Sequence, residues 1–166
     1  YAFEYGMTPL KIDTLILNSG GGTGYGGDVV SALVAEREID VIVPAGARCM
    51  SNCVLVLAAG QNQIVEEGAR VGVHYVYWIG KADRKIEIDK DLSDWYFGEI
   101  GNADLYEDYK DFVISEELAS VSEVRSDDNF LVPAFVDAPL DTVFWPVAAF
   151  LMLDAADLVR YGVIGD

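Results

Sequence analysis

Short apolar runs alternate with polar turns in the first half of the chain and predict repeated strand–helix units. Residues 14–18 and 40–44 each have the length and composition of a buried parallel strand. Between them, residues 28–36 have apolar positions at helical spacing, and Asp28 is suited to the N-cap of that helix. Consecutive units of this kind predict a parallel sheet with right-handed crossovers.

A second unit follows the second predicted strand. Residues 52–59 are apolar almost without interruption, so a helix there must be buried on every side, and Gly60 ends it. Residues 45–51 read as the turn before that helix, and further strands are predicted over 63–66 and 70–75. The expected fold class is therefore α/β with a mostly parallel sheet.

The rest of the chain is more polar. Residues 79–94 are charged and are predicted to be exposed, whereas residues 102–118 have the spacing of an amphipathic helix. A short helix is predicted over 154–161, followed by a strand that starts at Val163 and Ile164.

Composition and charge limit the classes of protein to which this chain could belong. The chain has 166 residues, of which 52% are hydrophobic, and no linker divides it, which predicts a single domain over 1–166. The net charge of −17 opposes binding to nucleic acid or to an anionic membrane. It indicates a solvated acidic surface or, alternatively, a preference for cationic substrates. The longest apolar run, 54–59, is too short to cross a bilayer.

Two cysteines and one histidine are too few for a common zinc site, so no metal or cofactor is predicted. Cys49 and Cys53 form a local disulfide if the protein is exported and stay buried thiols if it is not. Two cysteines four apart within one regular helix have poor geometry for a disulfide, and both states stay open at this stage.

Residues 19–27 form a glycine-rich turn after the first strand. The spacing of Gly22, Gly24 and Gly26 is not the full dinucleotide-binding fingerprint, and no Gly-Lys-Ser/Thr is present. Consecutive glycines allow backbone N–H groups to approach a ligand closely, as an oxyanion hole requires. A tight turn without further function is the alternative.

Ser51 and His74 are the candidate catalytic side chains. Ser51 lies between a predicted turn and a buried helix, where it is either a nucleophile or an ordinary helix cap. His74 is the only histidine, so it is the only candidate imidazole base for an activated serine, although a lone histidine on a strand is often structural. With an unperturbed base, activity would rise as the pH passes about 6.5.

These motifs resemble a known family. Residues 15–74 resemble the proteolytic subunit of Clp protease, within the broader Clp/crotonase fold, and more closely the predicted periplasmic Clp-like proteins with a Cys-x-Ser-x-Cys segment. Residues 18–22 are similar to the family's Asn-Ser-Pro-Gly-Gly turn, with Gly20 in place of the proline. Residues 153–166 are similar to the family's closing helix and strand, and about 77–138 would form its helical insertion or handle.

The resemblance implies a catalytic site. Ser51 would be the nucleophile and His74 the general base, and the backbone N–H groups of Gly22, Gly21 and Asn52 would form the oxyanion hole. The spacing of nine residues from the serine to a glycine in Ala-Gly also matches the family.

The third member of the triad is less well placed by the resemblance. Asp141, in an Asp-Thr pair, resembles the family's acid but lies further from the histidine along the chain, and Asp127 and Asp128 compete with it.

Three functions follow from the resemblance. The first is a serine hydrolase, above all a peptidase acting on peptides or proteins; the second is an inactive Clp-like scaffold that binds peptides or assembles with partners. The third is acyl-thioester chemistry of the crotonase kind, for which no coenzyme-binding pattern is present. Exported or periplasmic location is favoured over cytoplasmic, and a homo-oligomer is expected, with contacts from the aromatic-rich segments 78, 95–97 and 144–145 unless these pack in the core.

Overall fold

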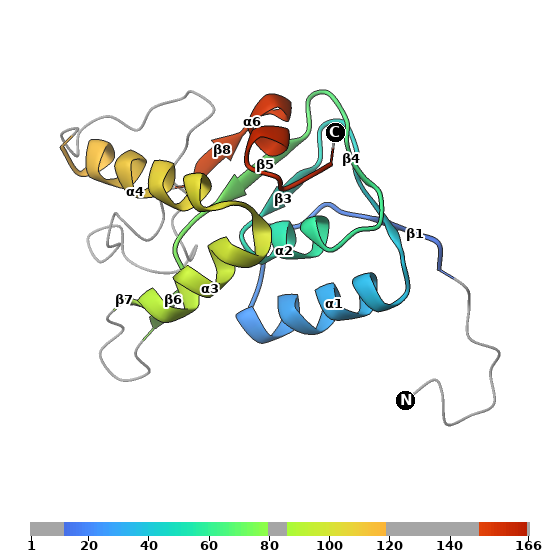
Figure 1. The fold of residues 1–166 in the computed structure, drawn as a ribbon, viewed down its shortest axis with the longest axis horizontal. Coiled ribbons are helices and arrows are strands. Elements are labelled where there is room, and N and C mark those ends of the chain that lie inside the picture. The colour runs from blue at the N-terminus through green and yellow to red at the C-terminus, as the bar shows by residue number, and fades with distance from the viewer. Residues whose placement is uncertain (1–11, 80–85, 119–149, 166) are drawn as a thin grey trace.

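A computed structural model describes residues 12–79, 86–118 and 150–165 as a mixed α/β fold (Figure 1). Sheet A has three parallel strands in the order β1 (Thr14–Ile16), β2 (Asp40–Val43) and β4 (Gln63–Val65). Val41 and Val43 of the central strand are fully buried, as the apolar run predicts. The predicted α/β class with a mostly parallel sheet is confirmed.

Helix α1 (Gly24–Glu36) connects β1 to β2 and begins earlier than the sequence predicts. Its N-cap is Thr23, whose Oγ1 accepts a hydrogen bond of 3.3 Å from the N–H of Gly26. The prediction that Asp28 caps the helix is therefore wrong, because the glycines that suggested a turn form its first helical turn instead.

Sheet B lies beside sheet A and contains β3 (Arg48–Met50), β5 (Arg70–Val73) and β8 (Leu151–Leu153). β3 and β5 are parallel, whereas β5 and β8 are antiparallel. The sequence predicts only a turn where β3 lies, because three residues are too few to show a period. Pairing with β5, not local propensity, makes this segment a strand.

Helix α2 (Asn52–Ala58) follows β3 and packs against α1 on one side and α3 (Lys90–Ile100) on the other (Figure 1). Every residue from 52 to 57 is buried, which confirms the prediction of a helix enclosed on all sides. Because α2 is held between two other helices, its first turn is a rigid position for a functional group.

The second half adds a hairpin and two helices. β6 (Tyr77–Ile79) and β7 (Ile86–Ile88) are antiparallel, and α3 begins at an N-cap, Asp89, whose carboxylate accepts from the N–H of Leu92 at 2.9 Å. The predicted exposed segment 79–94 therefore contains the start of a helix and a fully buried Ser93.

Helix α4 (Ala103–Leu118) confirms the predicted amphipathic helix. Its Tyr109 meets Phe97 of α3 with ring centroids 5.1 Å apart, and both side chains are buried. The predicted extent of the insertion stays a prediction, since residues 119–138 lie outside the described residues.

Helix α6 (Ala155–Arg160) closes the described structure with a capping box between Asp154 and Asp157. The predicted strand at Val163 and Ile164 is wrong: both N–H groups donate to the carbonyl of Leu158, so the chain turns back on the helix end.

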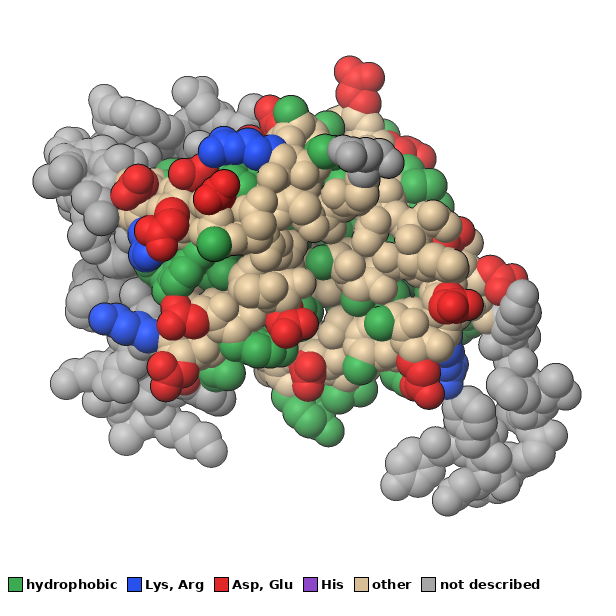
Figure 2. All heavy atoms as spheres, in the orientation of Figure 1, with side chains coloured by type: hydrophobic (Ala, Val, Ile, Leu, Met, Phe, Trp, Pro, Cys, Tyr) green, Lys and Arg blue, Asp and Glu red, His purple; other side chains and the backbone are tan. Residues whose placement is uncertain are grey.

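Acidic side chains are spread over the visible face of the molecule, with few Lys or Arg side chains between them (Figure 2). This dispersion fits a solvated acidic surface better than one concentrated binding patch. Within the described ranges, none of the helices combines the length and apolar character needed to cross a membrane.

Candidate active site

Ser51 and His74 each follow the end of a strand, and the two strands are neighbours. Ser51 comes directly after β3 and His74 directly after β5, and the backbone N–H of Ser51 donates to the carbonyl of Gly72 at 2.8 Å. Because β3 and β5 are parallel, their carboxyl ends lie at the same edge of sheet B. The fold thus brings two residues 23 positions apart in the sequence to one edge.

The backbone of Ser51 has an unusual conformation, with φ 56° and ψ −132°. Positive φ disfavours any residue with a Cβ, and such a conformation costs about 1–3 kcal/mol unless surrounding contacts hold it. The hydroxyl makes no capping bond to α2, which removes the alternative of an ordinary helix cap. A sharp strand-to-helix turn of this kind presents a nucleophile outward from the sheet.

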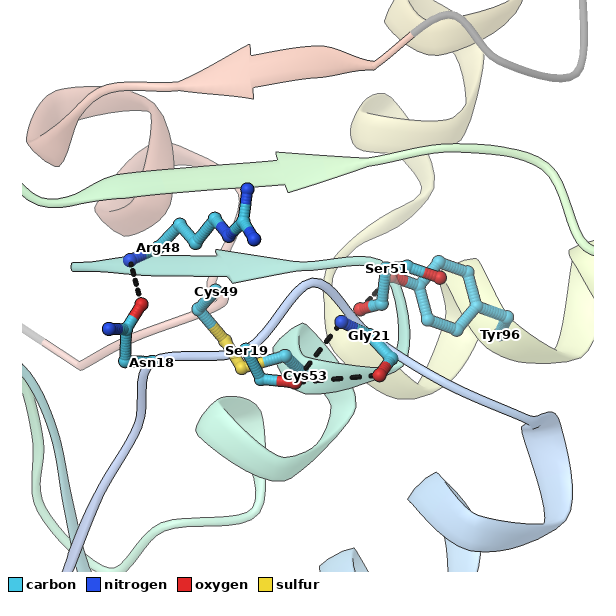
Figure 3. Close-up of a disulfide and its surroundings, with 8 residues drawn as sticks. All are labelled: Asn18, Ser19, Gly21, Arg48, Cys49, Ser51, Cys53 and Tyr96. Carbon is cyan, nitrogen blue, oxygen red and sulfur yellow. Dashed lines mark hydrogen bonds between the residues drawn. A yellow bond between two sulfur atoms is a disulfide. The ribbon is translucent and has the colours of Figure 1, made fainter. Parts of the chain in front are cut away.

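The glycine-rich turn lies against Ser51 (Figure 3). Gly21 has φ +100°, and a Cβ on it would lie 2.7 Å from Cβ of Ser51 and 2.8 Å from the carbonyl oxygen of Met50. Next to it, the side-chain amide of Asn52 donates to the carbonyl of Gly22 at 3.0 Å. Absence of a side chain at 21 is therefore what allows the turn to approach the serine.

Two of the three predicted oxyanion donors are available. The N–H of Gly21 donates to Oγ of Ser19 at 3.1 Å, so it is already engaged. In the part of the chain that the structure describes, the N–H groups of Gly22 and Asn52 have no acceptor. Asn52 is the first residue of α2, where N–H groups lack partners within the helix and the helix dipole favours a negative charge.

His74 is nearly buried, with 8% of its surface exposed. Its Nδ1 lies 2.5 Å from the carbonyl oxygen of Tyr75. A carbonyl only accepts, so Nδ1 carries the proton, and in the neutral ring Nε2 is left as the basic nitrogen. Burial lowers the pKa of His74 to about 4, and the hydrogen bond to Tyr75 opposes that effect only in part.

Aromatic rings surround the imidazole. Phe150, just before β8, meets it edge to face with centroids 4.7 Å apart, and the Tyr77 ring lies at 5.5 Å. No hydrogen bond joins the His74 ring to Ser51 or to a carboxylate among the described residues. The predicted acid, Asp141, lies outside them, as do its competitors at 127 and 128.

A disulfide joins Cys49 and Cys53, which flank Ser51 in the sequence (Figure 3). Cys49 belongs to β3 and Cys53 to α2, and their Cα atoms are 5.1 Å apart. The expected difficulty of bridging two cysteines in one helix does not arise, because the chain turns sharply at Ser51. The disulfide links the two elements that meet at the serine.

We expect reduction of this disulfide to lower the free energy of unfolding by roughly 2 kcal/mol, the chain-entropy value for so short a loop. Urea unfolding of the oxidised chain and of chain refolded in reductant measures the difference. A Cys49→Ala/Cys53→Ala variant is the control and should not respond to reductant. Equal free energies of unfolding for the oxidised and reduced chains would contradict stabilisation by the disulfide.

Tyr96 is a contact of the serine that the sequence does not single out. Its hydroxyl, from α3, donates to the carbonyl of Ser51 at 2.8 Å. The aromatic-rich segment around it suggested core packing or assembly, and Tyr96 and Phe97 are indeed buried. Among the described residues, no group of three His, Cys, Asp or Glu is placed to hold a metal ion.

Three solved structures, of two proteins, are similar to this chain. A lysine-to-alanine mutant of the 1510-N membrane-bound stomatin-specific protease in complex with a substrate peptide is 17% identical, with TM-score 0.50, and the match covers 92% of this chain and 59% of that one. A serine-to-alanine mutant of the same protease is 16% identical, with TM-score 0.50 and coverage of 92% and 62%. An N-to-D mutant of ClpP1 from Listeria monocytogenes is 12% identical, with TM-score 0.42 and coverage of 91% and 70%.

No family model matches the sequence, and no curated protein matches it either. The chain spans about three-fifths of the length of the first two structures. At these identities the likeness concerns the fold alone. The chain has a mixed α/β, Clp-protease-like fold of the Clp/crotonase type.

Proposed function

We propose that this chain is a serine peptidase in which Ser51 is the nucleophile and His74 the general base. The observation that carries the proposal is the backbone of Ser51, held at positive φ between a strand and a helix with its hydroxyl uncapped. The N–H groups of Gly22 and Asn52 would bind the oxyanion. The protease names of the structures that share this fold support a peptide or protein substrate.

The reaction follows from these roles. Oγ of Ser51 forms a bond to the substrate carbonyl carbon while its proton passes to Nε2 of His74, and the carbonyl electron pair moves onto the oxygen as an oxyanion. Collapse of this intermediate breaks the C–N bond, and His74 gives its proton to the leaving amine. Water, deprotonated by the same nitrogen, then attacks the acyl carbon, the ester C–O bond breaks, and His74 returns the proton to Oγ of Ser51 as the acid product leaves.

The carbonyl of Tyr75 takes over one task of a triad acid in this proposal. In a Ser-His-Asp triad the carboxylate accepts from Nδ1, fixes the tautomer and stabilises the imidazolium. A neutral carbonyl fixes the tautomer equally well but supplies less stabilisation of positive charge. Asp141 stays a proposal for a carboxylate that would add this stabilisation.

The finer relationship is also a proposal. The disulfide across Ser51 supports kinship with the predicted periplasmic Clp-like proteins that carry Cys-x-Ser-x-Cys, since disulfides persist in oxidising compartments. A single domain over residues 1–166 and a homo-oligomer complete the proposal.

Labelling with a fluorophosphonate probe tests the function directly. The oxidised, full chain should form one covalent adduct with loss of fluoride, and mass spectrometry should place it on Ser51. Ser51→Ala should lose the adduct, whereas Ser31→Ala, at a buried serine of α1, should keep it. A folded chain that forms no adduct would support the alternative of an inactive scaffold, which the missing hydrogen bond between Ser51 and His74 favours.

The pH dependence of labelling follows from the buried state of His74. The base acts only when neutral, and its pKa is lowered to about 4, so labelling should rise through about pH 4 and be level from about pH 5 to pH 8. The Tyr77 ring lies against the imidazole, and burial raises the pKa of its hydroxyl, so Tyr77 stays neutral over this range. A midpoint near 6.5 instead would mean that the working imidazole is exposed to water.

A further inference from the structure

The carbonyl of Ser51 is held from a separate helix. Its oxygen accepts two hydrogen bonds of 2.8 Å: one comes from the N–H of Val54, an ordinary bond of a first helical turn, and the other from the hydroxyl of Tyr96. Tyr96 lies 45 residues further along the chain, on α3. Figure 3 shows its ring reaching the serine from the side opposite the disulfide.

The carbonyl of Ser51 and the N–H of Asn52 belong to one peptide group. That group is planar and trans, so its oxygen and its N–H point in opposite directions and rotate together. A hydrogen bond that fixes the oxygen therefore fixes the direction of the N–H. Donation to the carbonyl also polarises the peptide and strengthens the N–H as a donor.

Tyr96 is suited to fix this peptide. Its side chain is 1% exposed and its ring packs edge to face on Phe97, with centroids 5.3 Å apart. Burial raises the pKa of its hydroxyl far above the ordinary value, so it stays a donor at every working pH. The bond thus does not titrate with His74.

We propose that Tyr96 is a positioning residue that aims the N–H of Asn52 at the oxyanion and keeps Ser51 in its reactive conformation. This inference rests on the proposed peptidase function, because the N–H matters only if an oxyanion forms. It also assigns a role to α3, which is to couple the packing of the helical half to the geometry of the nucleophile.

Tyr96→Phe removes only the hydroxyl and leaves the Val54 bond in place. We expect the rate of fluorophosphonate labelling to fall about tenfold or more, a fraction of the loss of a whole oxyanion donor. The pH profile of labelling should keep its midpoint, because His74 is unchanged. For a peptide that the wild-type chain cleaves, kcat should fall with little change in KM, since the donor acts on the transition state.

Tyr161→Phe is the matched control. Tyr161 is also buried and also loses a hydroxyl bond, of 2.6 Å to Asp108, but it directly follows α6, and no hydrogen bond joins it to Ser51 among the described residues. It should label at the wild-type rate. The substitution Tyr96→4-aminophenylalanine restores a donor at the same place and should recover labelling, which a loss of packing would not allow.

The outcomes separate the inference from the function it rests on. If the wild-type chain does not label, the proposed function fails. If the wild-type chain labels and Tyr96→Phe labels equally fast, only the role of Tyr96 fails. If Tyr96→Phe does not fold, the Tyr96→4-aminophenylalanine variant is compared with the wild-type chain instead. Near wild-type labelling by this variant supports the inference. If the variant folds, keeps its donor and still labels at less than a tenth of the wild-type rate, the inference is overturned.

Discussion

His74→Ala is expected to slow the labelling of Ser51 by fluorophosphonate by about a hundredfold to ten-thousandfold, the range for loss of a general base. The substitution removes the proposed base, and a neutral serine hydroxyl is a weak nucleophile. The measurement is the second-order rate of adduct formation by the oxidised, folded chain at about pH 7.

Added imidazole distinguishes a chemical role from a structural one. The alanine variant leaves space among the rings of Tyr77 and Phe150, and free imidazole should recover part of the labelling rate there. A variant that has only lost packing would not respond to imidazole.

Lys90→Ala is the matched variant, which tests whether a lysine and not His74 is the base. Serine–lysine pairs replace serine–histidine pairs in some hydrolases, so a lysine is the other side chain to test as the base. Lys90 is exposed at the first position of α3, the helix that contacts Ser51 through Tyr96. We expect wild-type labelling from this variant. If Lys90→Ala loses labelling and His74→Ala keeps it, His74 is not the base.

Gly21→Ala is expected to destabilise the fold by about 3 kcal/mol and to slow labelling about a hundredfold. The added Cβ would meet Ser51 and the carbonyl of Met50 at less than 3 Å, in a backbone conformation with φ +100° that alanine rarely adopts. Relief of the clash must move the glycine-rich turn or the serine, and small displacements of reacting groups are costly. Urea unfolding measures the first effect and labelling the second.

Gly20→Ala is the control from the same turn. A Cβ on Gly20 meets nothing within 4 Å, and the backbone there has no positive φ. Its free energy of unfolding should stay within about 0.5 kcal/mol of wild type. Equal effects of the two substitutions would mean that Gly21 does not fit closely against the serine.

The sequence predicts the first half of this fold well for a physical reason. Strand β2 and helix α2 consist of apolar runs that are buried in the fold. The expectation of a buried strand is wrong for β1, because β1 lies at the edge of sheet A and its Ile16 is exposed. β3 is different: Arg48, Cys49 and Met50 carry no period and become a strand only through pairing with β5. Long-range pairing of this kind leaves no local signal.

The same distinction holds at the site. Ser51 and His74 could be selected from residue chemistry and from resemblance, and the structure places each after one of two paired strands. The contacts that define their states come from elsewhere: the carbonyl of Tyr75 fixes the tautomer of His74, and α3 supplies Tyr96. Every residue has a main-chain carbonyl, so the sequence does not mark the one that accepts from His74. A tyrosine in an aromatic-rich helix cannot be told from a core residue by its sequence context.

The acceptor of the His74 proton has a consequence for mutational scanning. A carboxylate acceptor is lost by a single codon change, whereas every amino acid at position 75, proline included, retains a main-chain carbonyl. Substitutions of Tyr75 will therefore report on the packing of its side chain and not on the acceptor. The backbone path after β5 places the carbonyl that orients the imidazole. Substitution of side chains one at a time leaves that carbonyl in place, so a mutational scan does not detect it.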